Sequence, residues 1–147
     1  MTQRLSALTL LVQDYDEAIA FYVGRLGFEL LEDRRLDATK RWVRIRPRGK
    51  ADAAGPSLIL ARAATPEQVA RIGDQTGGRV FLFVETDRFW EDYERWRARG
   101  VHFLELPRQE PYGTVVVFQD LYGNRWDLIQ PGPAAESRTF STVPGGA

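Results

Sequence analysis

The chain has 147 residues, 44% of them hydrophobic and 12% aromatic, which is enough for one domain, or two small halves sharing a core, without stabilising metals or disulfides. Its 20 basic and 20 acidic side chains balance, so no overall field attracts nucleic acid or an anionic membrane, and a small neutral molecule is the favoured partner. The absence of cysteine excludes disulfides, thiolate zinc sites, iron–sulfur clusters and cysteine nucleophiles.

The N-terminal segment predicts a β-strand. Its apolar run, residues 8–12, is too short for a signal-peptide core or a membrane span, and acidic residues follow at once. We therefore expect a cytoplasmic protein with no membrane partner.

A helix is expected to follow this strand. Asp14 lies at its predicted N-cap and Glu17 at its third position, the spacing of a capping box. Gly27 supplies a left-handed stop. The predicted buried stripe of this helix consists of Ile19, Tyr22, Val23 and Leu26.

The same order of signals recurs in residues 80–106, with an apolar strand, Asp87 as the expected cap of a second amphipathic helix, Gly100 and another strand. Asp14 and Asp87 are 73 residues apart, and so are Gly27 and Gly100. One offset for both landmarks indicates an internal duplication of a β-α-β-β-β unit.

The remaining strands also correspond, "RWVRIRP" to "GTVVVFQD" and "GPSLILAR" to "GNRWDLIQ", with turn-rich loops at "RGKADAAG" and "DLYGN". Between the halves, residues 65–73 predict a linker helix with Thr65 as its cap and Pro66 at its first position. Residues 132–147, rich in Pro, Gly and Ser, are expected to form a flexible tail.

The opening "LTLLVQDYDEAIAFYVGRLGFEL", the middle "RARGVHFLELP" and the ending "VVVFQDLYGNRWDLIQP" resemble the vicinal oxygen chelate superfamily of glyoxalases, bleomycin resistance proteins and extradiol dioxygenases. The resemblance covers residues 5–131. It implies an α+β fold in which two tandem β-α-β-β-β modules, about 4–62 and 78–131, form a cup-shaped mixed sheet. These modules would make up a single domain, residues 1–131, and the family usually forms homodimers, which would also cover exposed edge strands.

The resemblance also implies positions for a divalent metal. Family members place His seven residues before the helix-capping aspartate, which here gives Ala7 and Val80, and Glu in the last strand of each module, which here gives Ile59 and Asp127. Three of these four side chains cannot coordinate a cation. We therefore expect no cofactor and a hydrocarbon-lined cup base that binds a ligand, with a divalent metal as the disfavoured alternative.

Asp127 has two interpretations. It can be a pocket carboxylate that orients a cationic or hydroxyl-bearing ligand or acts as a general base, or a strand aspartate bonded to a neighbour. His102, the one histidine, is the other candidate for acid–base catalysis, with a surface role as its alternative.

Strand alternation places Trp42, Arg44 and Arg46 on the face opposite Val43, toward the cup or solvent. Arg44 could hold an anionic ligand or pair with Asp127, or it could, like Arg46, belong to an exposed arginine ladder. Trp42 and Tyr112 are expected at the cup mouth, where a flat ring can stack on a planar ligand.

The other aromatic residues are expected to be structural. Phe89, Tyr93 and Trp96 share one face of the second helix and predict core packing, whereas Trp90 lies off that face and could meet a dimer partner or the tail. Strand alternation adds further predicted core positions, namely Phe103, Phe118 and, behind the sheet from Asp127, Trp126.

Three functions follow from these residues. The favoured one is metal-independent binding of a small, partly aromatic or hydrophobic molecule in the cup. The second is a metal-dependent lyase, isomerase or dioxygenase with non-standard ligands such as His102, Glu105 and Asp127. The third is a metal-free acid–base enzyme that uses Asp127 or His102, with Arg44 holding an anionic substrate. Whether the protein is an enzyme is left open by the sequence.

Overall fold

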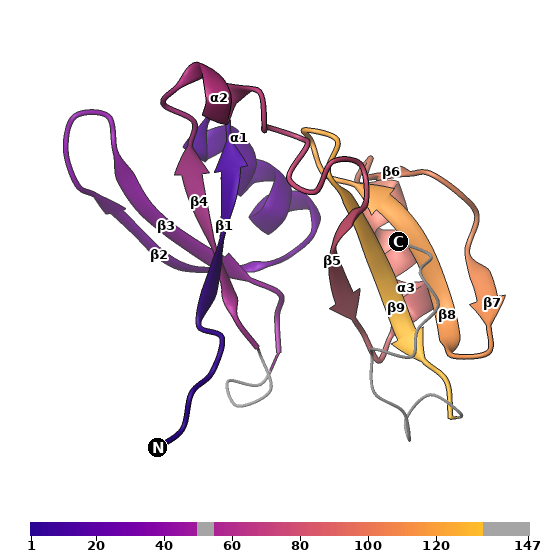
Figure 1. Cartoon of the computed structure of the whole chain (residues 1–147). Coiled ribbons are helices and arrows are strands. Elements are labelled where there is room, and N and C mark those ends of the chain that lie inside the picture. The colour runs from indigo at the N-terminus through magenta and orange to yellow at the C-terminus, as the bar shows by residue number, and fades with distance from the viewer. Residues whose placement is uncertain (50–54, 134–147) are drawn as a thin grey trace. The chain divides into compact units, whose positions relative to one another are not determined.

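The computed structural model describes residues 1–49 and 55–133 and contains two mixed sheets with few helices (Figure 1). The chain divides into two compact units, Met1–Gln75 and Thr76–Ala147. The predicted α+β class and the repeat of strand, helix and further strands are confirmed. Residues 50–54 of the first predicted loop and 134–147 of the predicted tail lie outside the described residues.

In the first unit, helix α1 (Tyr15–Ile19) and the π-helix η1 (Ala20–Arg25) follow the first strand and precede the others. Its four strands are β1 (Ala7–Val12), β2 (Glu29–Arg35), β3 (Arg41–Arg46) and β4 (Ser57–Arg62), in the sheet order β1-β4-β3-β2. Strand β1 runs parallel to β4, and the other neighbours are antiparallel. The buried side of β3 carries Val43 and Ile45, as predicted.

The predicted N-cap of α1 is confirmed, because the Asp14 carboxylate accepts a hydrogen bond from the Glu17 backbone N–H at 2.8 Å. The predicted stripe is only partly right. Tyr22 and Leu26 are buried, but Ile19 and Val23 are half-buried, and Ala18 and Phe21 take buried positions instead. The helix widens to π geometry at Ala20, which shifts later side chains from the 3.6-residue pattern.

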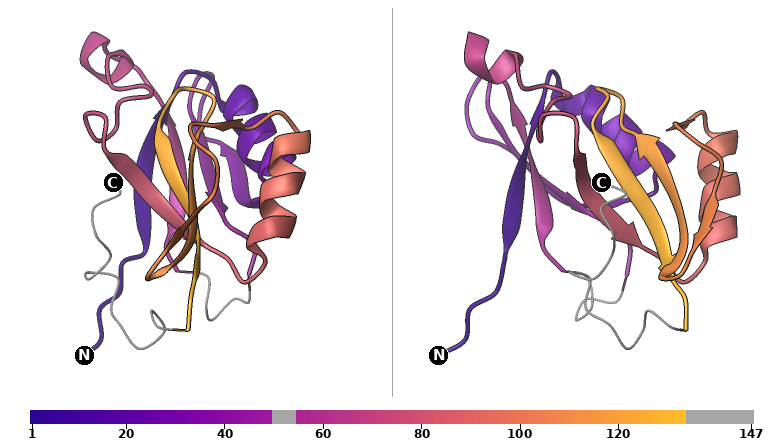
Figure 2. Two further views of the ribbon diagram at one scale, coloured as in Figure 1. Left: turned by 90° about the vertical axis from the view of Figure 1, so that its right-hand side faces the viewer. Right: turned by 45° about the vertical axis from the view of Figure 1, so that its right-hand side comes forward.

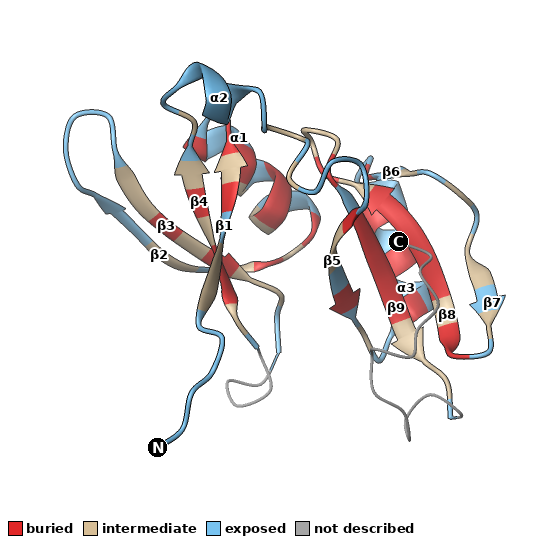
Figure 3. Cartoon of the chain, in the orientation of Figure 1, coloured by how far each residue is buried: buried red, intermediate tan, exposed pale blue. Residues whose placement is uncertain are grey.

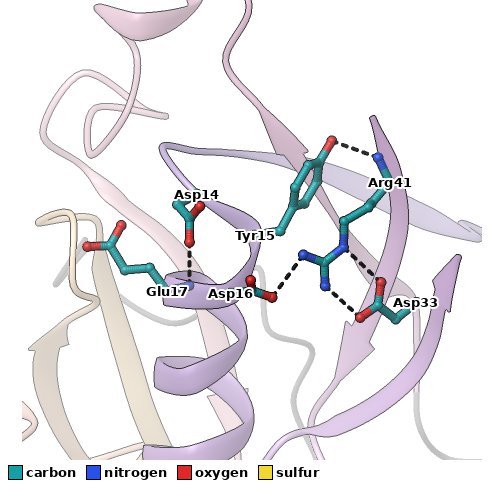
Figure 4. A network of polar contacts seen from close by, with 6 residues as sticks. All are labelled: Asp14, Tyr15, Asp16, Glu17, Asp33 and Arg41. Atoms are coloured by element: carbon teal, nitrogen blue, oxygen red, sulfur yellow. Dashed lines mark hydrogen bonds and ion pairs between the residues drawn. The ribbon is translucent and has the colours of Figure 1, made fainter. Parts of the chain in front are cut away.

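Arg41 ties the start of α1 to the β2–β3 hairpin (Figure 4). Its guanidinium donates to both carboxylate oxygens of Asp33, at 3.0 and 2.7 Å, and to Asp16 at 2.8 Å, and it lies over the Tyr15 ring. The Tyr15 hydroxyl accepts from the Arg41 backbone N–H. The same guanidinium holds the pKa of Asp33 below its usual value. This fork is a specific link between two elements that are distant in sequence.

We predict that Arg41→Lys lowers the free energy of unfolding by about 1 kcal/mol, because an ammonium group cannot make the two parallel bonds to Asp33. Urea denaturation measures the change. Arg34→Lys is the matched control, since the Arg34 side chain is 66% exposed and its Nε lies 3.6 Å from Glu32, too far for a hydrogen bond. Equal stability of both variants would show that the fork contributes nothing beyond charge.

The linker begins as predicted. Thr65 accepts from the Gln68 backbone N–H at 3.2 Å, and Pro66 occupies the first turn of α2 (Pro66–Val69). The helix is shorter than the predicted 65–73. Residues 70–74 continue as turns with bonds between residues three apart, such as Asp74 N–H to the Arg71 carbonyl.

The second unit contains β5 (Val80–Glu85), α3 (Phe89–Ala98), β6 (His102–Phe103), β7 (Arg108–Glu110), β8 (Gly113–Gln119) and β9 (Arg125–Pro131). The sheet order is β5-β9-β8-β6, and β7 also pairs with β8 (Figure 1). The single strand predicted after Gly100 is therefore divided into β6 and β7. The tight turn between β8 and β9 is present, with Asp120 accepting from the backbone of Tyr122 and Asn124.

The prediction that Asp87 caps the second helix is wrong. The N-cap position belongs to Arg88, which makes no side-chain cap bond. The Phe89 N–H instead donates to the Gln130 side chain of β9 at 2.9 Å, and Thr86 accepts from Arg88 N–H while donating to Asp92. A side chain from a neighbouring strand replaces the local cap. The left-handed glycine stops do repeat, with φ of 76° at Gly27 and 82° at Gly100.

Helix α3 lies along one face of the β8–β9 region, and Figure 2 shows this packing from two further directions. Phe89, Tyr93 and Trp96 are buried, as predicted. Ring contacts connect this helix to the sheet, Tyr93 with Phe103, Trp96 with Phe118, and Phe118 with Trp126. The predicted core role of Phe118 and the placement of Trp126 behind the sheet are confirmed, whereas Phe103 is half-buried at the edge of this ring cluster. Trp90 is 54% exposed.

Gly113 marks a close approach between the start of β8 and the end of β9. Its φ is +148°, and a Cβ atom there would lie 2.2 Å from the Gln130 carbonyl oxygen. Only glycine fits beside that backbone atom.

Gly113→Ala is expected to lower the free energy of unfolding by about 2 kcal/mol or more, because strand β8 or β9 must shift to relieve the clash. Thermal and urea denaturation report the loss. Gly24→Ala serves as the control, since nothing lies within 4 Å of its added Cβ. A stable Gly113→Ala variant would mean that the two strands part at little cost.

Candidate functional site

The face of the second sheet opposite α3 is defined by strand alternation. Along β9, Trp126 and Leu128 share the helix side with Gln130, so Asp127 and Ile129 lie on the other side. Register places Phe83 of β5 and Val117 of β8 beside Asp127. We call Phe83, Val115, Val117, Asp127 and Ile129 the Asp127 face.

Asp127 is a buried carboxyl group on this face. The residue is 3% exposed, and its Oδ1 atom has no hydrogen-bond partner among the residues described. Burial raises the pKa of Asp127 to about 6, while the nearby positive charge of Arg108 lowers it and the negative charge of Glu105 raises it further. A carboxyl group in such surroundings is costly to keep ionised and unpaired.

The positive charge of Arg108 acts on the Asp127 carboxyl group, but the Arg108 guanidinium is already bound to the carboxylates of Glu105 and Glu110. Its Nε donates to Glu105 at 2.5 Å, and its Nη1 donates to Glu110 at 2.7 Å. Register pairs Arg108 with Val115, which puts it over the Asp127 face. The hydrogen bonds to Glu105 raise the pKa of Arg108 above its usual value, and hydrogen bonds to Glu110 and Tyr112 add smaller contributions.

Apolar side chains form most of the wall around Asp127. Val115 and Ile129 are almost fully buried and cluster with Tyr112, and Val117 is 8% exposed. Figure 3 shows β8 and β9 as largely buried along their length. Phe83 is the exception at 41% exposed, so a ring of this face is accessible.

Tyr112 lies where the predicted loop meets the strand, but its side chain is 9% exposed and packs against Val115 and Ile129. The ring is therefore not openly exposed, and the predicted ligand-binding role of Tyr112 stays a prediction. The turn between β7 and β8 brings the Tyr112 side chain back onto the sheet, and the Tyr112 backbone carbonyl accepts a hydrogen bond from the Gly132 N–H. Its ring contributes to the wall instead.

The candidates of the first unit lie on the face of their sheet opposite Val43. Arg44 donates to Glu32 at 2.7 Å and to the Ser57 hydroxyl at 3.2 Å, and its guanidinium lowers the pKa of Glu32. Arg46 lies 3.3 Å from Glu29. These cross-strand pairs agree with a charged ladder. The pairing of Arg44 with Asp127 stays a prediction.

Trp42 and Ile59 share that face with Arg44 and are half-buried, and Ala7 pairs in register with Ser57. In the second unit, Val80 is 8% exposed and pairs with Arg125. No group of three or more His, Asp or Glu side chains that could hold a metal occurs within residues 1–49 and 55–133. The predicted ligand-binding roles of Trp42, Ile59, Ala7 and Val80 stay predictions.

His102 lies on β6, is exposed, and pairs with Gln119. Strand β8 separates it from β9, so it is not the neighbour of Asp127 in the sheet. A different feature, a groove at the ends of β5 and β9, is lined by Glu85, Thr86, Asp87, Gln130 and Pro131 and does not include Asp127. The Gln130 side chain there already serves as the cap of α3.

The sequence did not single out Arg108, Glu110 or Phe83. Arg108 and Glu110 are two residues apart, the spacing that puts side chains on one face of a strand, but the flanking prolines at 107 and 111 obscure the short strand β7. Phe83 was visible only as one of several apolar residues in β5. Its exposure depends on which face the helix covers.

The chain belongs to the Glyoxalase/Bleomycin resistance protein/Dioxygenase superfamily, which matches residues 4–128. It is 53% identical over 131 residues to an uncharacterized protein of Shewanella frigidimarina, covering 88% of this chain and 95% of the relative. Two solved structures share the fold. UcmS2 is 32% identical with a TM-score of 0.73, and the match covers 88% of this chain and 98% of UcmS2.

The second structure is TnmS3, described as an antibiotic binding protein from Streptomyces sp. CB03234. It is 30% identical with a TM-score of 0.70, and the match covers 89% of this chain and 98% of TnmS3. The predicted superfamily is thus confirmed. Among the helices in the described part of the chain, none has the length and apolar character needed to cross a membrane.

The stability of the Asp127→Asn variant should depend on pH in one direction. The pKa of Asp127 is about 6 in the folded protein and 3.8 for an ordinary aspartate, so the folded protein binds the extra proton and loses stability as pH rises between these values. The amide of the Asp127→Asn variant does not titrate, so the variant does not lose this stability. In urea unfolding from pH 4 to 8, the free energy of unfolding of the variant should rise relative to wild type by about 2 kcal/mol, with no further rise above pH 7. A constant difference would contradict the raised pKa.

Proposed function

We propose that this protein binds a small, partly aromatic or hydrophobic molecule at the Asp127 face, without a metal cofactor. The observation that carries the proposal is a buried carboxyl group in a wall made mainly of hydrocarbon, with no hydrogen-bond partner for its Oδ1 atom among residues 1–49 and 55–133. Such a surface can remove an apolar ligand from water and orient it through one polar contact. The accessible ring of Phe83 gives a planar ligand a stacking partner.

Antibiotic binding by TnmS3 supports this class of ligand, because the two chains are similar over nearly their whole length. Fold alone would not, since unrelated chemistries share it. The support therefore comes from the combination of a binding relative and an apolar face with one orienting carboxyl group.

The side chains at the family's metal positions support metal-free binding. Ala7, Ile59 and Val80 offer no donor atoms, and Asp127 is influenced by the positive charge of Arg108. Hydrocarbon and a neighbouring guanidinium suit an organic ligand better than a divalent cation. The degenerate metal site is part of this proposal, and a bound divalent metal is its alternative. We also propose a cytoplasmic homodimer, in which a second copy covers an edge strand such as β2.

A second candidate function is acid–base catalysis by Asp127. A pKa of about 6 allows a carboxyl group both to donate and to accept a proton near neutral pH. An enzyme of this kind would lose turnover in Asp127→Asn, whereas a binding protein would show no turnover to lose.

Binding of the neutral fluorescent probe N-phenyl-1-naphthylamine tests the proposed function. We expect saturable binding to wild type and about tenfold weaker binding to Phe83→Ala, because that change removes the accessible ring of the face. Trp90→Ala is the control, since Trp90 on α3 is an aromatic residue even more exposed than Phe83. Absence of saturable binding, or equal weakening in both variants, would reject the Asp127 face as the binding surface.

A further inference from the structure

The unsatisfied oxygen of Asp127 indicates what the ligand must carry. Buried polar atoms in proteins nearly always have a partner, and those that lack one need an explanation. Asp127 Oδ1 is buried without such a partner among the described residues, on a face with an accessible aromatic ring. We propose that the bound molecule carries a protonated basic nitrogen that donates a hydrogen bond to Asp127. This inference rests on the proposed function and specifies its ligand.

The charges around Asp127 favour a cation over an anion. Strand β7 and the bend before it contribute Arg108, Glu105 and Glu110, and Arg108 is bound to both glutamates. Its guanidinium is therefore compensated before any ligand arrives, and of the three carboxyl groups Asp127 has no directly bound cation in the described part of the chain. A carboxylate ligand would have to displace Glu105 or Glu110 from Arg108 and approach Asp127 as a like charge.

Other charged or titratable groups on this side of the sheet do not alter that balance. Arg125 and Glu85 lie two strand positions from Asp127 and from Phe83, respectively, and both are exposed. His102 lies beyond β8 on β6 and is also exposed. Exposed groups interact weakly through water, whereas a buried pair is held in a medium of lower polarity. The carboxyl group that a ligand can compensate is Asp127.

Paired binding of this kind is linked to protonation. The cation requires ionised Asp127, so ligand binding releases the proton that Asp127 holds below its pKa. Affinity for an amine should fall by about tenfold per pH unit below that pKa and level off above it. A neutral ligand that makes only apolar contacts should bind without this dependence.

Three probes with one scaffold test the inference, namely 1-naphthylmethylamine, 1-naphthalenemethanol and 1-naphthoate. Titrations at pH 7.5, followed by chemical shifts of the β8 and β9 amides, should show the amine binding about tenfold more tightly than the alcohol, with the carboxylate weakest. Asp127→Asn should abolish the preference for the amine. Glu91→Gln removes the same charge from an exposed position on α3 and should leave the preference unchanged.

Equal affinities of the amine and the alcohol would overturn the inference while leaving the proposed function in place. Retention of the amine preference in Asp127→Asn, checked for its fold by the same spectra, would also overturn it. In wild type alone, amine affinity that does not change between pH 5 and 7.5 would contradict the pairing. Absence of binding by all three probes at these strands would reject both the inference and the proposed function.

Discussion

The alternation of side chains along β9 constrains the whole second unit. Because Trp96 of α3 contacts Phe118 of β8, and Phe118 stacks on Trp126 of β9, these rings share the helix face and the residue after Trp126 must point to the opposite face. That residue is an aspartate flanked by strands rich in valine. A register slip of one residue would bury the carboxyl group under the helix and expose a tryptophan, so the aromatic layer fixes the position of Asp127.

Much of the fold follows from local sequence signals. The caps at Asp14 and Thr65 and the glycines that end both longer helices are short-range features, and the structure has them where the sequence predicts. The alternation around Val43 and Trp126 also predicts the buried faces, because a strand has only two sides. Because the two halves repeat, the order of strand, helix and further strands in the first half also predicts the order in the second half.

The features that the sequence could not predict depend on tertiary contacts. The start of α3 is capped by Gln130, which is 41 residues away, and therefore Asp87 is not needed as a cap. The division of the strand after Gly100 permits β7 to pair with β8, which brings Arg108 to the Asp127 face and buries Tyr112. Asp127 could be identified from the family pattern, but only the structure shows its charged neighbours and that its Oδ1 atom lacks a hydrogen-bond partner within the described residues.

Ligand binding at this face depends on Asp127 being a buried carboxyl group whose Oδ1 has no hydrogen-bond partner among the described residues. The most direct measurement is an NMR titration of the Asp127 side-chain carboxyl ¹³C signal in ligand-free protein. We predict a midpoint near pH 6, since burial raises the pKa of this group. A midpoint at or below 3.8, its ordinary value, would show that the protein itself stabilises the ionised carboxylate and would contradict the account.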